Sequence, residues 1–326
     1  MKTNLTRRRL IGALAVAALP LPLRAQADFP SRPIRIVVPF PAGGSLDNLG
    51  RVLAAKMTES LGQSVVVDPR AGGATVIGTQ IVQKAPADGY TLLFMANSFL
   101  LTPMLMQKAP PWDPLKDFVP VSLLARVNQV LVAHPTFAPR NVKELVAAAK
   151  ATPGSINFAS FGNGTSSHLG VELFKKEAGI DMTHVPYKGV APALQDVLGG
   201  QVKLFLTNFP EVLPHIQAGR LRALAVADEK RLPQLPDVPT FAEQGFPGFL
   251  VYSWYGCVAP AGTPDVAVKK LHAAFAQALS APDMVERLTK QGMVILNSPG
   301  EELRRFMASE QAKYLEPVRL SGAKIE

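Results

Sequence analysis

Two kinds of segment alternate along most of this chain, and their alternation limits the folds that it can form. Short apolar runs rich in β-branched residues, such as residues 34–39 and 91–95, predict buried strands. Between such runs lie segments, for example 49–61 and 167–178, in which apolar residues recur at helical spacing. Because parallel strands need a crossover connection, which is usually a helix, the alternation predicts an α/β fold with mostly parallel sheets.

Three glycine-rich turns connect a strand to a helix and contain many small polar residues. They read FPAGGSLD at 40–47, RAGGAT at 70–75 and FGNGTSSH at 161–168. A helix start offers unpaired N–H groups and the positive end of the helix dipole, and both favour an anion. Each turn alone could equally well serve only to cap its helix, since Ser, Thr and Asp are favoured caps. Three such turns together favour a site for an anionic small molecule at the carboxyl ends of the strands.

The N-terminus accounts for much of the positive charge. The chain has 326 residues and a formal net charge of +9, and five of its basic residues precede Ala27. They flank an apolar run at 10–23, which is followed by the small-residue motif Ala-Gln-Ala. This arrangement predicts a secretory signal peptide, residues 1–27, with cleavage after Ala27 and a mature protein outside the cytoplasm. The TRRRLI motif at 6–11 also resembles a twin-arginine signal, and general secretion is the alternative export route.

The remaining sequence disfavours nucleic-acid binding and several kinds of catalysis. Without the five N-terminal basic residues the chain has 29 basic and 25 acidic residues, with no basic patch interleaved with aromatic residues. Walker, dinucleotide-binding and nucleophile-elbow motifs do not occur in the sequence. The five histidines are scattered singly, and the one cysteine, Cys257, cannot build a thiolate metal site. We therefore expect a binding protein with no metal and no cofactor, not an enzyme.

Segments along nearly the whole mature chain resemble one protein family. They include RPIRIVVPFPAGGSLDNLGR near the N-terminus, GNGTSSHLGVELFK at 162–175, HVPYKGVAPALQDVLGGQV at 184–202 and WYGCVAPAGTP at 254–264. The chain resembles the periplasmic solute-binding receptors of tripartite tricarboxylate transporters, the Bug family of TctC-type receptors. The resemblance implies a periplasmic-binding-protein-like clamshell of two α/β domains joined by crossing hinge strands, near 122–125 and 223–226. It assigns 28–124 plus 224–326 to domain 1 and 125–223 to domain 2.

The resemblance also implies a ligand and partners. The ligand is a small carboxylate held between the domains, and the partners are the membrane permease subunits of the transporter, with the receptor as a monomer. We expect the carboxylate to lie between the N–H groups of 42–44 and the 162–166 turn, with hydroxyl donors from Thr165 and Ser166. The expected ligand-binding residues are Phe40, Pro41, Ala42, Gly43, Gly44, Asp47, Ala96, Asn97, Ser98, Gly162, Asn163, Gly164, Thr165, Ser166, His168, Tyr187, Thr207 and Asn208.

The chain departs from the family pattern at positions expected near the ligand. Where many relatives have an Asp before the Asn of one strand, this chain has Thr207 before Asn208. Without an acidic residue facing the ligand, an amino-acid cargo is disfavoured. Phe99 and Phe209 would favour an aromatic or alkyl carboxylate if they line the pocket, and packing in the core is the alternative. Two other functions remain open: a ligand-presenting sensor component, and a periplasmic enzyme that acts on a carboxylate.

Overall fold

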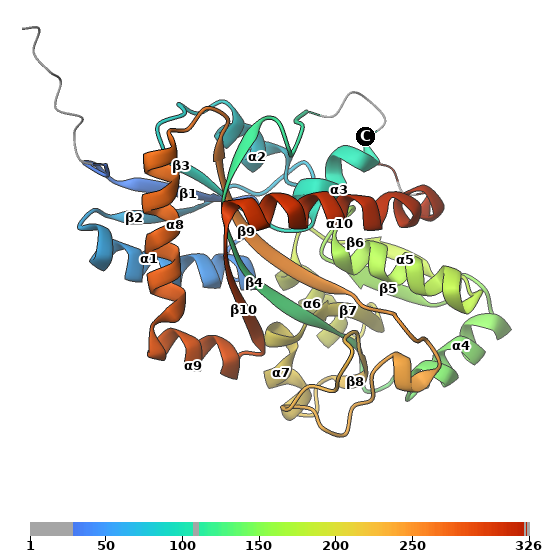
Figure 1. Cartoon of the computed structure of the whole chain (residues 1–326). Helices are drawn as coiled ribbons and strands as arrows, with labels where there is room; N and C mark the ends of the chain where they lie inside the picture. The colour runs from blue at the N-terminus through green and yellow to red at the C-terminus, as the bar shows by residue number, and fades with distance from the viewer. Residues whose placement is uncertain (1–28, 107–110, 323, 325–326) are drawn as a thin grey trace, which may run out of the picture.

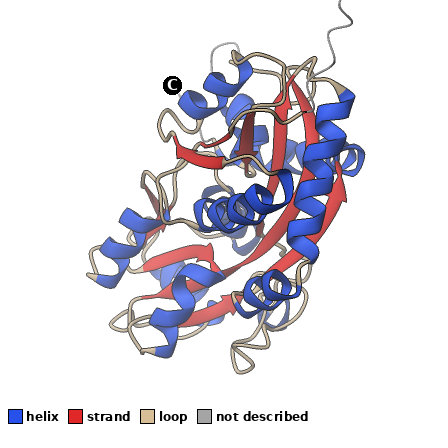
Figure 2. Cartoon of the chain, turned by 90° about the vertical axis from the view of Figure 1, so that its left-hand side faces the viewer, coloured by secondary structure: helices blue, strands red, loops and turns tan. Residues whose placement is uncertain are grey.

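The computed structural model describes residues 29–106, 111–322 and 324. The expected signal peptide and its cleavage site lie outside these residues. Ten strands form one connected sheet in the order β2-β1-β3-β9-β4-β7-β5-β6, with β8 and β10 also paired to β4. Helices cover both faces of this curved sheet, as Figure 2 shows. The expected α/β class is therefore confirmed.

Strand β4 (Phe118–Ala133) is the longest strand and belongs to both halves of the molecule (Figure 1). Over Phe118–Asn128 it pairs with β9 (Tyr252–Pro260), and over Gln129–Ala133 it pairs with β7 (Leu204–Asn208). We call the half on the β9 side lobe 1 and the half on the β7 side lobe 2. Strand β4 therefore runs through both halves and changes partners at 128–129, beyond the hinge expected near 122–125, while residues 223–226 belong to β8 in lobe 2.

The remaining strands divide between the lobes. In lobe 1, β2 and β3 both pair in parallel with β1, and β10 pairs with β4. In lobe 2, β6 and β7 both pair in parallel with β5, and β8 pairs with β4. All antiparallel pairs described involve β4 or β9, so each lobe keeps a parallel wing. The bounds are β1 Ile34–Val38, β2 Val65–Pro69, β3 Thr91–Met95, β5 Asn157–Ser160, β6 Thr183–Pro186, β8 Arg222–Val226 and β10 Met293–Pro299.

The helices enclose each wing from both sides. Lobe 1 contains α1 (Ser45–Leu61), α2 (Val76–Gln83), α3 (Ser98–Leu105), α8 (Asp265–Ser280), α9 (Pro282–Lys290) and α10 (Gly300–Ser321). Lobe 2 contains α4 (Val142–Ala151), α5 (Ser166–Ala178), α6 (Val190–Leu198), α7 (Phe209–Gln217) and the 3-10 turn η1 (Ala242–Gln244). Covered on both faces, the wing strands are near-continuous apolar runs such as IRIVV and TLLFM.

Each lobe has its own hydrophobic core. In lobe 1, residues of α1, α8 and α9 pack on one face of the sheet, while residues of α2, α3 and α10 pack on the other. In lobe 2, α4 and α5 cover one face and α6 and α7 the other. Phe99 and Phe209 are buried in these cores, so core packing explains both rings and neither is a pocket wall.

The segment after β8 packs in lobe 2. Phe241, Phe249 and Val251 are buried in the same core as α4 and α5, and Gln244 accepts a hydrogen bond from the N–H of Val142. The sequence had placed 224–326 in domain 1, but residues 224–251 lie against the second core. The chain returns to lobe 1 only where β9 begins, because the loop between β8 and β9 has its own apolar residues to bury.

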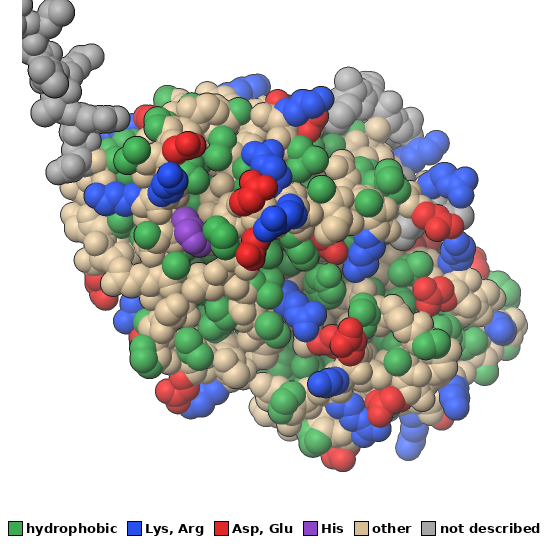
Figure 3. Space-filling model, viewed as in Figure 1, with side chains coloured by type: hydrophobic (Ala, Val, Ile, Leu, Met, Phe, Trp, Pro, Cys, Tyr) green, Lys and Arg blue, Asp and Glu red, His purple; other side chains and the backbone are tan. Residues whose placement is uncertain are grey.

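One glycine holds α2 close to the end of β1. A Cβ atom on Gly78 would lie 2.8 Å from both the carbonyl oxygen of Arg70 and the Cβ of Pro39. Only glycine permits this approach, which brings the 70–75 turn beside the 40–47 turn. Among the described residues, no helix is long and apolar enough to cross a membrane. Acidic and basic side chains are interspersed over the face drawn in Figure 3.

Candidate functional site

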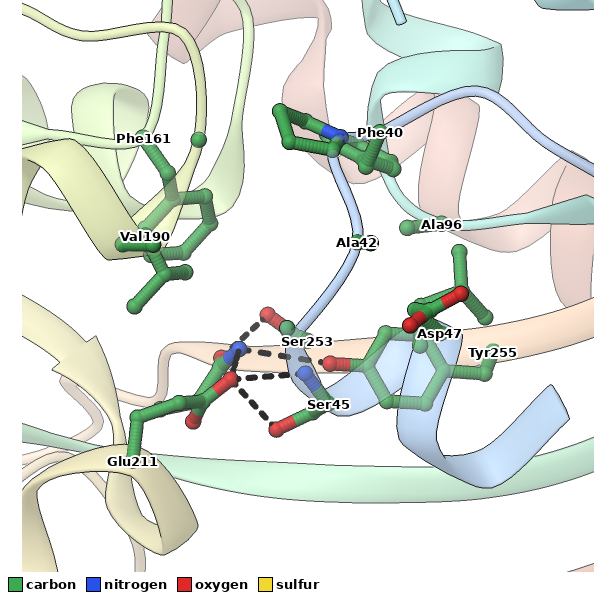
Figure 4. Close-up of a pocket in the computed structure, with 16 residues that line it drawn as sticks. Phe40, Ala42, Ser45, Asp47, Ala96, Phe161, Val190, Glu211, Ser253 and Tyr255 are labelled. Atoms are coloured by element: carbon green, nitrogen blue, oxygen red, sulfur yellow. Dashed lines mark hydrogen bonds between the residues drawn. The ribbon is translucent and has the colours of Figure 1, made fainter. Parts of the chain in front are cut away.

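A cleft lies between the lobes, at the ends of the strands that precede the glycine-rich turns. Its deep part, the inner cavity, has a volume of about 50 Å³ and is lined by α1 residues of lobe 1 and by Asn208 and Glu211 of lobe 2 (Figure 4). Its outer part, the outer groove, has a volume of about 470 Å³. Phe40, Pro41 and Phe161 line both parts, so the two volumes adjoin.

Most of the residues expected from the sequence lie at this cleft. The inner cavity is lined by Phe40, Pro41, Ala42, Gly44, Asp47, Ala96 and Asn208. The outer groove is lined by Ser98, Gly162, Asn163, Thr165 and Tyr187, together with Phe40 and Pro41. Gly43 faces a neighbouring hollow between α1 and α6. The other expected residues are not part of the lining of the inner cavity or the outer groove. They are Asn97, Gly164, Ser166, His168 and Thr207.

The start of α1 presents backbone N–H groups to the inner cavity. Gly44 is the N-cap and provides no side-chain cap. The carboxylate of Asp47 instead accepts the N–H of Gly43 at 3.0 Å and an ion pair from Arg51 at 2.9 Å, which fixes the turn. The N–H groups of Gly44 and Leu46 have no hydrogen-bond partner within the described chain. Both residues line the cavity, so an anion placed there meets unpaired donors.

The hydroxyl groups at the start of α5 are bonded within the protein. Thr165 Oγ1 donates to the carbonyl oxygen of Gly162 at 2.7 Å and accepts the N–H of His168, which makes Thr165 an N-cap. Ser166 Oγ accepts a 2.8 Å hydrogen bond from Gln129 Nε2. It lies 3.2 Å from Ser253 Oγ, which can accept the Ser166 proton because Ser253 donates its own proton to Asn208. These residues therefore shape the turn, and their hydroxyl protons are not free for a ligand in the way the sequence suggested. Backbone N–H groups of the turn remain as donors.

The second glycine-rich turn lines the outer groove with two unpaired hydroxyls. Its backbone has positive φ angles at four consecutive residues, which are 133° at Gly72, 55° at Gly73, 51° at Ala74 and 77° at Thr75. Such backbone conformations are costly for Ala and Thr and are found most often at functional sites. Thr75 Oγ1 and Ser98 Oγ are buried, without a partner in the described chain, and both residues line the groove. The sequence showed this turn but did not identify Thr75 as a site residue.

Comparison with known proteins agrees with this architecture. The model of the family described as "Tripartite tricarboxylate transporter family receptor" matches residues 49–319. The chain belongs to this receptor family. It is 39% identical to Protein BugT of Bordetella pertussis over 325 residues, which cover 99% of this chain and all of that protein. The resemblance inferred from the sequence motifs is therefore confirmed.

Two solved receptors of similar fold contain carboxylates. The R. palustris structure titled "Rpa4515 with adipate" has a TM-score of 0.87 and 35% identity and covers 91% of this chain and 99% of that one. The structure titled "MatC (Rpa3494) from Rhodopseudomonas palustris with bound malate" has a TM-score of 0.84 and 32% identity. It covers 89% of this chain and 100% of that one. Among the described residues of this receptor, no cluster of His, Cys, Asp or Glu could hold a metal ion.

A buried polar network lies at the base of the receptor's cleft and connects both lobes. Gln129 Nε2 donates to Ser253 Oγ at 3.1 Å as well as to Ser166, and Ser253 Oγ donates to Asn208 Oδ1 at 2.6 Å. Asn208 Nδ2 in turn donates to Tyr255 Oη at 3.2 Å. The network joins the start of α5 to the start of α7 through Gln129 of β4 and Ser253 of β9. Ser253 and Tyr255 were missed because nothing local in the β9 sequence marks them.

An acidic residue does face the inner cavity. Glu211, in the first turn of α7, accepts hydrogen bonds from the N–H of Ser45 at 2.9 Å and from Ser45 Oγ at 2.5 Å. These bonds run from lobe 1 to lobe 2, as the dashed lines in Figure 4 show. The sequence argument against an amino-acid cargo assumed that no acid is present here, and that assumption is wrong. Glu211 was missed because it is 166 residues from Ser45 in the chain.

Two stacked histidine rings lie behind the 162–168 turn. The ring centroids of His168 and His184 are 3.9 Å apart with nearly parallel planes, and Gly164 N–H donates to His168 Nδ1. Burial, and secondarily the charge of the neighbouring ring and of Lys175, lowers the pKa of His168 to about 3. Burial and Lys175 lower the pKa of His184 to about 4. Both rings are therefore neutral near pH 7, where His168 acts as an acceptor that supports the turn.

This pair should make the receptor less stable in acid. Each folded-state pKa lies below the unfolded value, so the unfolded chain binds more protons between about pH 4 and 6.5 and stability falls as pH falls. The expected loss is about 1.4 kcal/mol per ring for each pH unit below 6.5. Urea unfolding at pH 7.5 and 5.5 should show a smaller loss for His184→Phe than for the parent. Ala55→Val, on the exposed face of α1, changes no titratable group and should keep the parental difference. Equal losses in all three proteins would contradict the assignment.

Proposed function

We propose that this protein is an extracytoplasmic receptor that captures a small carboxylate, most simply a dicarboxylate, for a tripartite tricarboxylate-type transporter. The observation that supports it most is the start of α1, whose unpaired N–H groups line the inner cavity between the lobes. The presence of malate and adipate in two similar receptors supports a carboxylate as the cargo class. Catalysis has no such support, since the family is described as receptors.

The cleft suggests how a dicarboxylate would lie. One carboxylate would occupy the inner cavity at the N–H groups of the α1 turn, with the carbon chain passing between Phe40 and Phe161. The second polar end would reach the outer groove, where Thr75 and Ser98 offer unpaired hydroxyls. Lys188 is the only cationic side chain among the described lining residues. The cargo would thus be bound mainly by neutral hydrogen-bond donors and by one cation of the outer groove. Such binding is weaker than a buried ion pair and favours the release that a receptor requires.

Filling the inner cavity should remove binding without harming the fold. A Cβ on Gly44 would meet nothing within 4 Å, and its φ of −80° suits any residue. Gly44→Val should therefore fold with the parental melting temperature and lose measurable binding of malate and adipate, with Gly44→Ala intermediate. Calorimetric titration measures this, and Ala55→Val, on the exposed face of the same helix, is the matched control. Parental affinity of Gly44→Val would contradict the proposed position of the carboxylate.

We also propose that the lobes are two domains that close on the cargo. We divide the described residues into 29–106 plus 111–128 plus 252–322, and 129–251, which differs from the sequence division by the 224–251 segment and by the residues at the β4 crossing. Since the cleft is lined from both lobes, bound cargo should shift the population toward the closed form. Small-angle scattering should show a smaller radius of gyration with saturating malate or adipate, whereas Gly44→Val should not respond. An unchanged parental profile would count against closure.

The proposed location is the periplasm, with delivery of the cargo by the monomeric receptor to membrane permease subunits. It rests on the basic, apolar and Ala-Gln-Ala pattern of the first 27 residues and on the receptor family. Intact-mass measurement of the exported protein should give the mass of a chain that starts at Asp28. A mass that includes residues 1–27 would contradict the cleavage site, and replacing Ala25 and Ala27 by bulky residues should block processing.

A further inference from the structure

The most unusual group in the cleft is the carboxyl group of Glu211. The residue is half-buried. It belongs to lobe 2 and reaches across to the first residue of α1 in lobe 1. Three donors converge on one of its oxygens: Oε1 accepts from the Ser45 N–H, from Ser45 Oγ, and from Asn208 Nδ2 at 3.4 Å. Its other oxygen, Oε2, is buried without a partner in the described chain. Glu211 lines the inner cavity.

This distribution of hydrogen bonds fits a neutral carboxylic acid. A carbonyl oxygen accepts hydrogen bonds, whereas the hydroxyl oxygen of an acid offers a proton. Donors crowd onto Oε1 and none approaches Oε2, so Oε1 has the surroundings of the carbonyl oxygen and Oε2 those of the hydroxyl. An unpaired buried donor is costly, so an acceptor group of the cargo that reaches Oε2 would remove that cost.

Among the described residues, no Lys or Arg forms an ion pair with Glu211. The same cavity is lined from α1 by Asp47, whose charge is paired with Arg51, and from β9 by the phenol of Tyr255, whose pKa burial raises. The hollow on its other side is lined by uncharged residues: Val190, Ala191, Leu194, Pro210, Gln291 and Met293. On its own helix, His215 is bonded to Arg220 near the surface. Burial raises the pKa of Glu211, and its hydrogen bonds oppose that effect only in part.

We infer that Glu211 binds the cargo as a neutral acid, with its Oε2 proton donated to the cargo carboxylate in the inner cavity. The inference rests on the proposed function, and it adds that cargo capture is linked to one proton. An anionic Glu211 beside an anionic cargo would place two like charges in one enclosed site, which is strongly unfavourable. Below the pKa of Glu211 in the empty receptor, the proton is already on Oε2. Above that pKa it is taken from solvent when the cargo binds and returns to solvent when the cargo leaves.

Proton linkage sets the sign of the pH dependence. The bound cargo raises the pKa of Glu211 above its value in the empty receptor, so the complex holds more protons than the separate partners between the two values. Affinity must therefore fall as pH rises through that window, by up to about tenfold per pH unit for one linked proton. Glutamine has a carbonyl oxygen and an NH₂ donor in the place of the acid, and Glu211→Gln imitates the neutral form at every pH.

The test is calorimetric titration of malate and adipate into the parent receptor and three variants from pH 6.5 to 9. The affinity of Glu211→Gln should be within about threefold of the parental affinity at pH 6.5 and should exceed it as pH rises, because only the parent loses the linked proton. The ionisation of the cargo itself affects both proteins equally. Glu211→Leu should lose tenfold or more at pH 6.5, the cost of one hydrogen bond to a charged group. Glu310→Gln removes a buried carboxyl group outside the cleft and should follow the parent at every pH.

A second measurement reports the proton directly. The infrared difference spectrum between the parent and Glu211→Gln, both saturated with adipate, should contain the C=O band of a protonated carboxyl group. Three results would each contradict the inference but not the proposed function. They are a ratio of the parent and Glu211→Gln affinities that stays constant with pH, a Glu211→Gln affinity tenfold below that of the parent at pH 6.5, and the absence of that band. If neither acid binds the parent at pH 6.5, the proposed carboxylate function fails as well.

Discussion

The continuity of β4 is the constraint on which the whole receptor depends. One strand of 16 residues belongs to both halves of the sheet, so each lobe is built on one end of the same strand. Its middle residues, Asn128 and Gln129, are buried at the base of the cleft, where the strand changes its partners. Gln129 then fixes the start of α5 and the β9 strand at once. The two halves of the site are therefore positioned by a single amide side chain and by the strand that bears it.

Much of the fold and part of the site could be predicted, because both depend on local sequence. The alternation of strands and helices predicted the α/β class, and the FPAGGSLD turn predicted the α1 start that lines the inner cavity. What could not be predicted depends on contacts between distant residues. Glu211 meets Ser45 only after both lobes have folded, and Thr165 has the same sequence context whether its hydroxyl caps a helix or binds a ligand.

The positions of the Phe99 and Phe209 rings could not be predicted from the sequence either. Each follows a strand end close to expected site residues, and the sequence could not decide whether the ring faces the cleft or the core. In the structure both rings are buried among core residues, while Phe40 and Phe161 form the aromatic walls. Both rings belong to the first turn of a helix, α3 or α7, where a shift of one residue turns a side chain by about 100° around the helix axis. A carboxylate site made of backbone donors is equally hard to see in sequence, since every residue except proline has an N–H group.

Helix α10 connects the two lobes at a second place, in addition to the strands. It packs on β4 and α3 in lobe 1, and near its end Tyr314 joins a small apolar cluster with Leu169 of α5 in lobe 2. Lys176 and Glu316 add an exposed ion pair at the same place, and such pairs contribute little. Under the proposed closure, the lobes can separate only if α10 moves relative to α5. The apolar contacts at its tip would then oppose the opening of an empty receptor, so a surface far from the cargo would influence how fast the cargo is captured.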